Sequence, residues 1–219
     1  MSAKLAFIGT SHAAQHLSAA AEEKGFERVA PIYADLVFVS QDTPTDERGV
    51  RDLDVIRALV RIARDAGKPI VLTSAVPPGF TRSLGCEIWH QAETLRIIDA
   101  EERARNPEQI IVGAQDPAKA LPEPYQKYLA AFACPILLMT WEEAEFAKVA
   151  INAFLVAQVE MTNALASAAA KVGAKWDAVA ETLRLDARIG PKAYLTPGRW
   201  QDSRHLLRDN VTIKAILAR

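Results

Sequence analysis

The stretch that decides the fold is residues 4–14, which read KLAFIGTSHAA. Lys4 to Ile8 is a short apolar run that predicts a buried strand, and Gly9 follows as a residue that can make a tight turn. Ala13 to Lys24 then shows helical spacing and ends at Gly25. A strand, a glycine turn and a helix in this order are typical of the unit that binds dinucleotide phosphates at a helix N-terminus.

The turn departs from the G-x-G-x-x-G pattern of that unit at its second glycine. The six positions read Gly9, Thr10, Ser11, His12, Ala13 and Ala14. We expect the Ser11 side chain to push a pyrophosphate away and, if its φ is positive, to strain the backbone. The acidic residue expected after the second strand is also missing, because Val29-Ala30-Pro31-Ile32 occupies that place. Two interpretations stay open, a weakened dinucleotide site and an ordinary strand–turn–helix.

The rest of the first half alternates short apolar runs with helix-length stretches. The expected strands are residues 28–32, 36–40, 68–73, 87–89, 110–112 and 136–139. The expected helices are residues 52–67, with Asp52 as N-cap and Gly67 as the stop, and residues 121–132. This pattern predicts a reduced Rossmann-like α/β domain over residues 1–139, with a mostly parallel sheet.

The second half is helical. Residues 142–172 contain no Gly or Pro and carry apolar side chains on more than one face. Further helices are expected at residues 177–185 and from the Ser203 cap to residue 218, with a loop at 190–198. We therefore predict an all-helical central and dimerisation domain over residues 140–219, with a homodimer formed through the long helix.

Composition excludes several classes of protein. The formal net charge is −1 with interspersed signs, so we expect no nucleic-acid partner, and the N-terminus reads as neither a signal peptide nor a membrane span. Cys86 and Cys134 lack a CxxC spacing, which favours the cytoplasm and small buried thiols without a metal site. His12 and His16 share a helix face, either as half of a metal site or as polar residues near a helix start.

Longer motifs keep a common order along most of the chain. They are Asp35–Thr45 (DLVFVSQDTPT), Thr73–Gly79 (TSAVPPG), Ala92–Leu95 (AETL), Glu145–Leu155 (EFAKVAINAFL), Asp186–Gly190 (DARIG) and Pro197-Gly198. Together they resemble the UDP-glucose/GDP-mannose dehydrogenase family. That family oxidises a nucleotide-sugar hydroxyl twice, with NAD and a cysteine that holds the aldehyde as a covalent adduct.

The resemblance implies a role for particular side chains. Lys148 and Asn152 match the lysine and asparagine that polarise the reacting oxygen or its water, and Glu93 matches an acid or base. Each of these three also has the plain interpretation of a solvated surface residue. The resemblance further assigns Asp209 to positioning the water, Arg188 and Gly198 to the sugar, and Gly9, Ser11, Thr43, Pro44 and Ser74 to NAD.

Several positions depart from the family pattern. His205 stands where the family has its nucleophilic cysteine, and an imidazole cannot form the thiohemiacetal that carries an aldehyde to a second oxidation. Ala75 and Ala92 replace a threonine and a proline, tens of family residues are missing between Gly25 and Ala34, and the C-terminal UDP-binding domain is expected to be absent.

Three hypotheses about function follow. The first is a reduced NAD(P)-dependent oxidoreductase that makes one hydride transfer on a nucleotide sugar or small alcohol, with His205 as base. The alternative is a catalytically inactive homologue that acts as a binding or regulatory partner. A third is new chemistry at the inherited cleft, with His205, Glu93 and Lys148.

Overall fold

The computed structural model describes residues 3–218, which divide into two compact units. The first unit runs to Pro44 and resumes over Arg51–Lys148, and the second comprises Thr45–Val50 and the chain from Val149 onward. The first contains β1 (Lys4–Ile8), α1 (His12–Glu23), β2 (Glu27–Arg28), η1 (Pro31–Tyr33), β3 (Leu36–Val39), α2 (Asp54–Asp65), β4 (Ile70–Leu72), α3 (Phe80–Ser83), β5 (Trp89–Ala92), α4 (Ala100–Arg105), β6 (Ile110–Ala114), α5 (Glu123–Ala130), β7 (Ile136–Thr140) and the first turns of α6 (Trp141–Lys171).

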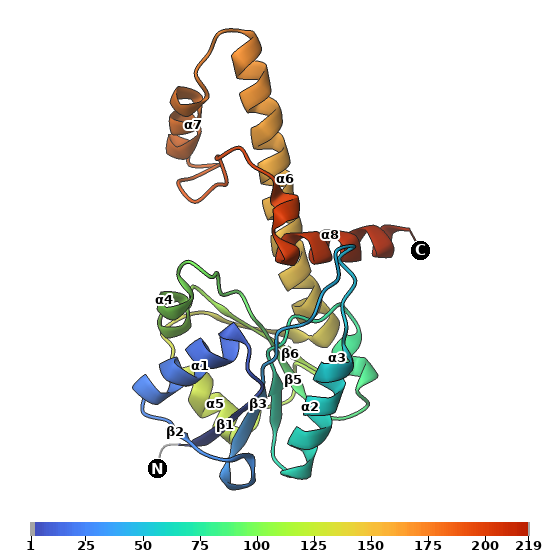
Figure 1. The fold of residues 1–219 in the computed structure, drawn as a ribbon. Coiled ribbons are helices and arrows are strands. Elements are labelled where there is room, and N and C mark those ends of the chain that lie inside the picture. The colour runs from blue at the N-terminus through green and yellow to red at the C-terminus, as the bar shows by residue number, and fades with distance from the viewer. Residues whose placement is uncertain (1–2, 219) are drawn as a thin grey trace. The chain divides into compact units, whose positions relative to one another are not determined.

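The strands form one seven-stranded sheet in the order β2-β1-β3-β4-β5-β6-β7 (Figure 1). Every neighbouring pair is parallel except β5 and β6, which are antiparallel. The predicted Rossmann-like fold with a mostly parallel sheet is therefore confirmed. β2 and β3 lie on opposite sides of β1, so the chain reverses its direction of winding there, and ligands of doubly wound sheets bind at such a switch point.

Helices cover both faces of the sheet (Figure 1). On one face α5 contributes Tyr125 and Tyr128 to a core that includes Phe38 of β3. On the other face α2 contributes Ile56, Val60 and Ala63, which recur at helical spacing against Val37 and Val39. β3 is buried along its whole length, as a parallel strand covered on both faces should be.

The predicted strand over residues 28–32 is wrong. β2 has only two residues, and Pro31 begins the 3-10 helix η1 instead of extending the strand. Proline has no N–H to donate to a sheet ladder, so it ends the pairing that the apolar run would otherwise continue. The carboxyl end of β2 is thus cut back to the level of Leu5.

Smaller corrections concern segments with weak local signals. α2 begins at Asp54, and the Asp52 carboxylate accepts from the Asp54 N–H instead of serving as the N-cap. The strand expected at residues 87–89 is β5, which lies at Trp89–Ala92 instead. Two of its buried residues, His90 and Gln91, are polar, so an apolar run does not mark the strand. The helices α3 and α4 were not expected, since four and six residues give little periodicity.

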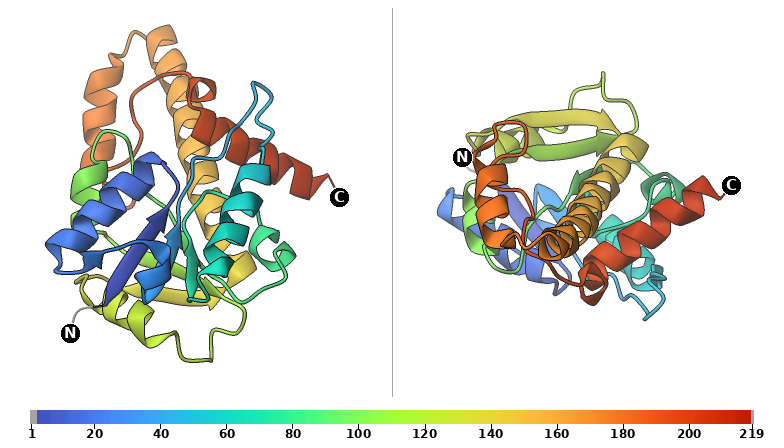
Figure 2. Two further views of the ribbon diagram at one scale, coloured as in Figure 1. Left: turned by 60° about the horizontal axis from the view of Figure 1, so that its bottom comes forward. Right: turned by 90° about the horizontal axis from the view of Figure 1, so that it is seen from above.

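The second unit contains most of α6, α7 (Trp176–Leu185), η2 (Trp200–Asp202) and α8 (Arg204–Leu217). Figure 2 shows α7 running back beside the later turns of α6. The expected loop at 190–198 is held by polar side chains of α6: the Gln158 amide oxygen accepts from Tyr194 N–H at 3.0 Å, and Thr162 Oγ1 donates to the Tyr194 carbonyl at 2.8 Å. Ser203 caps α8 as predicted, accepting from the Leu206 N–H.

α6 is the longest helix among the described residues, at 31 residues. By length and apolar composition alone it meets the requirement for crossing a membrane, but a core helix of a soluble protein passes the same test. Glycine shapes its start, because a Cβ on Gly113 of β6 would lie 2.9 Å from Ala144 Cβ and 3.1 Å from Trp141 Cα. A glycine at this position lets the first turn of α6 lie directly on the sheet.

Candidate functional site

The loops after β1 and β3 meet at the switch point of the sheet. Gly9 has φ of +108°, and a Cβ there would lie 2.2 Å from the Ser40 carbonyl oxygen. Only glycine fits this approach, so Gly9 makes the tight turn that the sequence predicts.

Ser11 behaves differently from the expectation of backbone strain. Its φ is −65°, and its buried side chain caps α1 by accepting from the Ala14 N–H at 2.9 Å. The same hydroxyl donates to the Ser40 carbonyl at 3.0 Å and lies 2.8 Å from Ser40 Oγ. The positive-φ strain is therefore absent, and one of the N–H groups that a phosphate would use at the helix N-terminus is already bonded.

A polar rim continues from this turn across the carboxyl ends of β1, β3 and β4. The Gln41 side-chain oxygen accepts from Thr10 N–H at 3.0 Å, and Gln41 N–H donates to Ser74 Oγ at 2.9 Å. Thr43 Oγ1 donates to the Ala75 carbonyl at 2.9 Å. The structure thus brings together Gly9, Ser11, Thr43 and Ser74, while Gln41, which links two of the loops, was missed because nothing in its local sequence marks it.

The two sides of the switch point differ in how much of a nucleotide-binding edge they offer. The loops after β3 and β4 form a fixed polar edge of the kind that holds a nucleotide in doubly wound sheets. The wall that would hold the adenosine ribose is cut back, because β2 ends at Arg28 and η1 follows with Ile32 and Tyr33 exposed. The polar rim is therefore complete on the β3–β4 side of the switch point and lacks a long strand on the β2 side.

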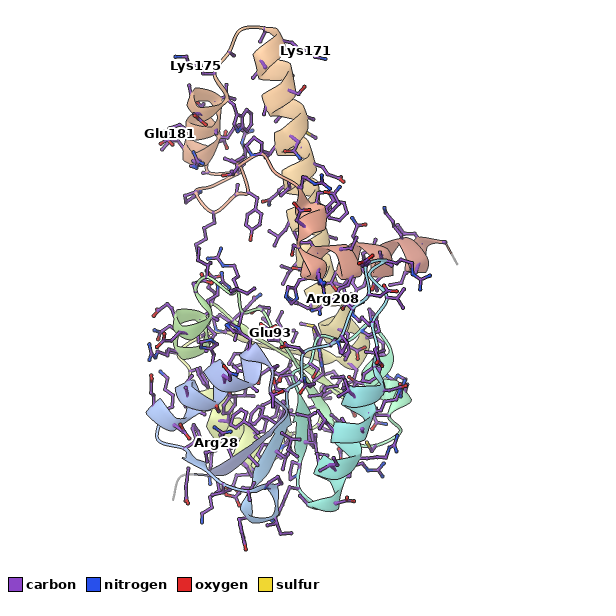
Figure 3. All side chains as sticks on the ribbon, in the orientation of Figure 1. Arg28, Glu93, Lys171, Lys175, Glu181 and Arg208 are labelled. Carbon is purple, nitrogen blue, oxygen red and sulfur yellow. The ribbon has the colours of Figure 1, made fainter. Side chains whose placement is uncertain are left out.

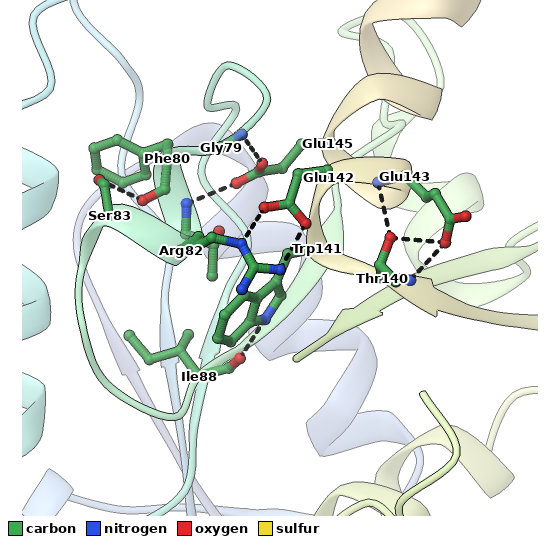
Figure 4. Close-up of polar contacts among 11 residues, drawn as sticks. Gly79, Phe80, Arg82, Ser83, Ile88, Thr140, Trp141, Glu142, Glu143 and Glu145 are labelled. Carbon is green, nitrogen blue, oxygen red and sulfur yellow. Dashed lines mark hydrogen bonds and ion pairs between the residues drawn. The ribbon is translucent and has the colours of Figure 1, made fainter. Parts of the chain in front are cut away.

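The first turns of α6 are fixed to α3 by polar contacts (Figure 4). The Glu145 carboxylate, fully buried, accepts from the N–H groups of Gly79 at 2.5 Å and Thr81 at 2.8 Å. Removal from water raises the pKa of Glu145 above its usual value, although these two hydrogen bonds oppose the change. Arg82 makes a two-pronged contact with Glu142 at 2.5 and 3.1 Å.

Glu93 lies on the loop after β5 (labelled in Figure 3) and is half-buried. One of its carboxylate oxygens accepts from the Leu95 N–H. It lines a cavity of about 30 Å³ together with polar and apolar side chains, among them Gln91, Arg103 and Tyr128. A cavity of this size has room for a water molecule or two, so Glu93 lies where proton exchange with water is feasible.

Lys148 closes the first unit. It is half-buried and forms no ion pair among the described residues, which distinguishes it from the paired surface lysines Lys4 and Lys127. A partly desolvated ammonium without a carboxylate partner is suited to stabilise negative charge on a substrate oxygen.

The second unit brings together two predicted residues that are far apart in the chain. Asn152 of α6 and Asp209 of α8 are both buried, and the Asn152 amide nitrogen donates to Asp209 Oδ2 at 2.5 Å over 57 residues of sequence. Arg208, labelled in Figure 3, lies beside Asp209 with Nε 3.8 Å from the other carboxylate oxygen. The plain interpretation of Asn152 as a helix-surface residue does not match this burial.

The remaining predicted substrate residues are exposed. The Arg188 guanidinium pairs with the Asp186 carboxylate, which lowers the pKa of Asp186, and Gly198 exchanges two hydrogen bonds with the Asn163 side chain. Gly198 and Trp200 line an open hollow of about 480 Å³, with Glu160, Asn163, Arg199 and Gln201. His205 is exposed in the first turn of α8.

No metal centre emerges from the histidines and cysteines. His12 Nε2 and His16 Nε2 are 3.1 Å apart, and within residues 3–218 no group of three or more His, Cys, Asp or Glu side chains is placed to hold an ion. Cys86 and Cys134 are free thiols, and both are only partly buried, whereas the sequence predicted small buried thiols. They lie at the edges of the two core clusters instead of inside them.

Comparison with known proteins identifies the family. The model of the central domain of the UDP-glucose/GDP-mannose dehydrogenase family matches residues 142–213, which span α6 to α8. The chain is 28% identical over 184 residues to UDP-glucose 6-dehydrogenase 1 of Arabidopsis thaliana, a match that covers 73% of this chain and 38% of that protein. The chain belongs to the UDP-glucose/GDP-mannose dehydrogenase family. Its α6 lies almost entirely within the segment that matches the central domain of that family.

Two further similarities define the extent of this membership. An uncharacterized protein of Methanocaldococcus jannaschii is 31% identical over 176 residues, covering 73% of this chain and 20% of that protein. The solved structure of a UDP-glucose dehydrogenase from Pyrobaculum islandicum superposes with a TM-score of 0.81 at 20% identity, covering 100% of this chain and 65% of that one. The chain spans between a fifth and two fifths of the length of these curated family relatives.

Proposed function

We propose that this family member is a reduced NAD(P)-dependent oxidoreductase, which oxidises one alcohol group of a nucleotide sugar or a smaller alcohol. The observation that carries the proposal is the buried Asn152–Asp209 hydrogen bond. A buried carboxylate and amide cost stability unless they are paired, and this pair joins two residues to which the resemblance assigns the reacting oxygen and its water.

The chemistry is a single two-electron step. The substrate C–H bond breaks as a hydride, the O–H bond gives its proton to a base, and a carbonyl forms. The nicotinamide ring, when bound, supplies the hydride acceptor. The family resemblance assigns the developing alkoxide to Lys148 and the orientation of an oxygen to Asn152, and we assign the proton to His205 or Glu93.

The step stops at the aldehyde or ketone. His205 replaces the nucleophile, so no thioester forms and the second oxidation to a carboxylate has no covalent intermediate to act on. Arg188 and the hollow beside Gly198 and Trp200 are the surface on which we expect the sugar to bind.

We also infer that the chain forms a homodimer in the cytoplasm through α6. Phe154, Met161 and Leu165 are exposed on this helix at spacings of seven and four residues, so they share one face. Light scattering tests the state of association, and Phe154→Lys is expected to convert a dimer to a monomer.

A cofactor-absorbance assay over nucleotide sugars and small alcohols tests the function, together with calorimetric titration of NAD and NADP. We expect reduced nicotinamide to form with at least one alcohol, and no formation of carboxylate. Failure to bind either cofactor at millimolar concentration would overturn the proposal and favour a non-catalytic binding role.

A further inference from the structure

Glu145 stands out as a buried carboxylate whose nearest hydrogen-bond partners are neutral, while the Arg82 guanidinium, paired with Glu142, acts on it only at longer range. Its side chain is fully buried, and among the described residues it forms no ion pair. Its two partners are the backbone N–H groups of Gly79 and Thr81, 66 and 64 residues away in sequence. Burial removes the carboxylate from water, and two hydrogen bonds from neutral donors offset only part of the lost hydration free energy. An apolar side chain at this position would attach the helix without that cost.

The two amides belong to the far end of the turn that follows β4. The near end of this turn carries Ser74, whose Oγ accepts from Gln41 in the polar rim, and Ala75, whose carbonyl accepts from Thr43. Gly79 has φ of +89° at the start of α3. The Glu145 carboxylate therefore holds one end of a turn whose other end is part of the candidate cofactor rim.

The same carboxylate belongs to the turn of α6 that precedes Lys148. Lys148 lies three positions after Glu145, which is a rise of about 4.5 Å along one rigid helix. Further contacts hold this part of α6: the Trp141 Nε1 donates to the Ile88 carbonyl at 2.7 Å, and the Arg82 guanidinium lies over the Trp141 ring at 5.2 Å. Among these contacts, the Glu145 bonds are the ones that reach the turn after β4 directly (Figure 4).

We propose that Glu145 is a positioning residue, whose buried carboxylate sets the height and rotation of Lys148 relative to the Thr73–Gly79 turn. The role of Lys148 rests on the proposed function, whereas its placement does not. A hydrophobic residue at position 145 would pack the helix without the desolvation cost but would leave the two amides unbonded. The carboxylate gives the helix one defined register against the turn.

Glu145→Gln tests this in the full chain, with Glu143→Gln as the matched control. Glutamine keeps the size but offers one acceptor oxygen, and its amide group meets the second N–H with another donor. Glu143 loses the same charge two residues earlier, and its carboxylate accepts hydrogen bonds from Thr140, which directly precedes α6.

The decisive measurement is the rate of amine-selective acetylation at Lys148 at one fixed pH, followed by mass spectrometry against the other lysines. In Glu145→Gln we expect the rate at Lys148 to change by about threefold or more while the other lysines stay unchanged, because the exposure of this half-buried side chain to the reagent changes. Glu143→Gln should leave all rates unchanged. If wild-type turnover exists, kcat should fall about tenfold in Glu145→Gln with KM within about twofold.

The outcomes separate the two proposals. An unchanged acetylation rate at Lys148 in Glu145→Gln, with only a lower unfolding temperature, would overturn the positioning role. Should that variant fail to fold, Glu145→Asp keeps the charge with a shorter reach, and an unchanged rate there overturns the role equally. Absence of turnover in the wild-type chain overturns the proposed function alone, since acetylation of Lys148 needs no substrate.

Discussion

The sheet unit and the helical unit carry their candidate residues in opposite ways. In the sheet unit, Ser11, Thr43 and Ser74 are buried and bonded to neighbouring loops. In the helical unit, Arg188, Gly198 and His205 are exposed, and only Asn152 and Asp209 are buried. A bonded, buried rim is set before a ligand arrives, whereas exposed side chains are ordered by the ligand itself. The candidate residues of the sheet unit are therefore held more rigidly than most of those of the helical unit.

The largest effect is expected at Asn152 of the helical unit, which is buried and hydrogen-bonded like the candidate residues of the sheet unit. Asn152→Ala removes the donor to the buried Asp209 carboxylate, so turnover should fall about 100-fold or more, and the unfolding temperature should drop as well. Steady-state kinetics and thermal unfolding check both effects. Thr182→Ala, which loses one exposed bond to the Ala178 carbonyl on α7, is the control and should change neither.

A second prediction tests whether the polar side chains buried in the sheet unit are excluded from water. Burial lowers the pKa of His90 from 6.5 to about 4, so the folded chain keeps this imidazole neutral while the unfolded chain takes up a proton. The stability from His90 is then complete above about pH 6.5 and is lost as the pH falls toward 4, with a total on the order of 3 kcal/mol.

His90→Gln should flatten this part of the stability curve, measured by denaturant unfolding between pH 4 and 7. His12→Gln is the control, because His12 is only partly buried. Equal acid sensitivity in His90→Gln and wild type would contradict the idea that the polar groups of the sheet unit are sealed from water.

The sequence was sufficient to predict the main strands and the long helix. It did not predict features that depend on contacts between residues far apart in the chain. Apolar runs located β1, β3 and β4, and the absence of Gly and Pro located α6. The run around Pro31 misled because its hydrophobicity is that of a strand, whereas its backbone lacks the needed N–H.

The candidate site shows the same division. Glu145 follows Glu142 and Glu143 in a pattern that is typical of a solvated helix start, and only amides more than sixty residues away give it a buried role. Asn152 and Asp209 were both named from the family resemblance, but their hydrogen bond depends on the packing of α6 and α8. Long-range pairing of this kind leaves no local periodicity to read.

A third prediction concerns the cap of α1 in the sheet unit. Ser11→Gly frees the Ala14 N–H for a phosphate, so we expect NAD affinity to rise about tenfold, as for one added bond to a charged group. The same change removes the bonds to Ser40 and should cost about 1–2 kcal/mol of stability. Calorimetric titration and thermal unfolding measure the two effects. Their opposite signs matter, because general damage to the fold would lower both quantities together.

The smallest effect is expected in the binding of the adenosine half of NAD, because β2 of the sheet unit has only two residues. β2 ends at Arg28, so the adenosine half of NAD finds no ribose wall, while the rim at Gln41, Thr43 and Ser74 is intact. Nicotinamide mononucleotide should therefore bind within about threefold of NAD, whereas a complete dinucleotide fold gains a large part of its affinity from the adenosine side. Competitive titration of the two compounds measures the ratio. A preference for NAD of a hundredfold would mean that η1 and its exposed Ile32 and Tyr33 form an adenosine surface after all, and the contrast between a complete rim and a missing wall would have to be abandoned.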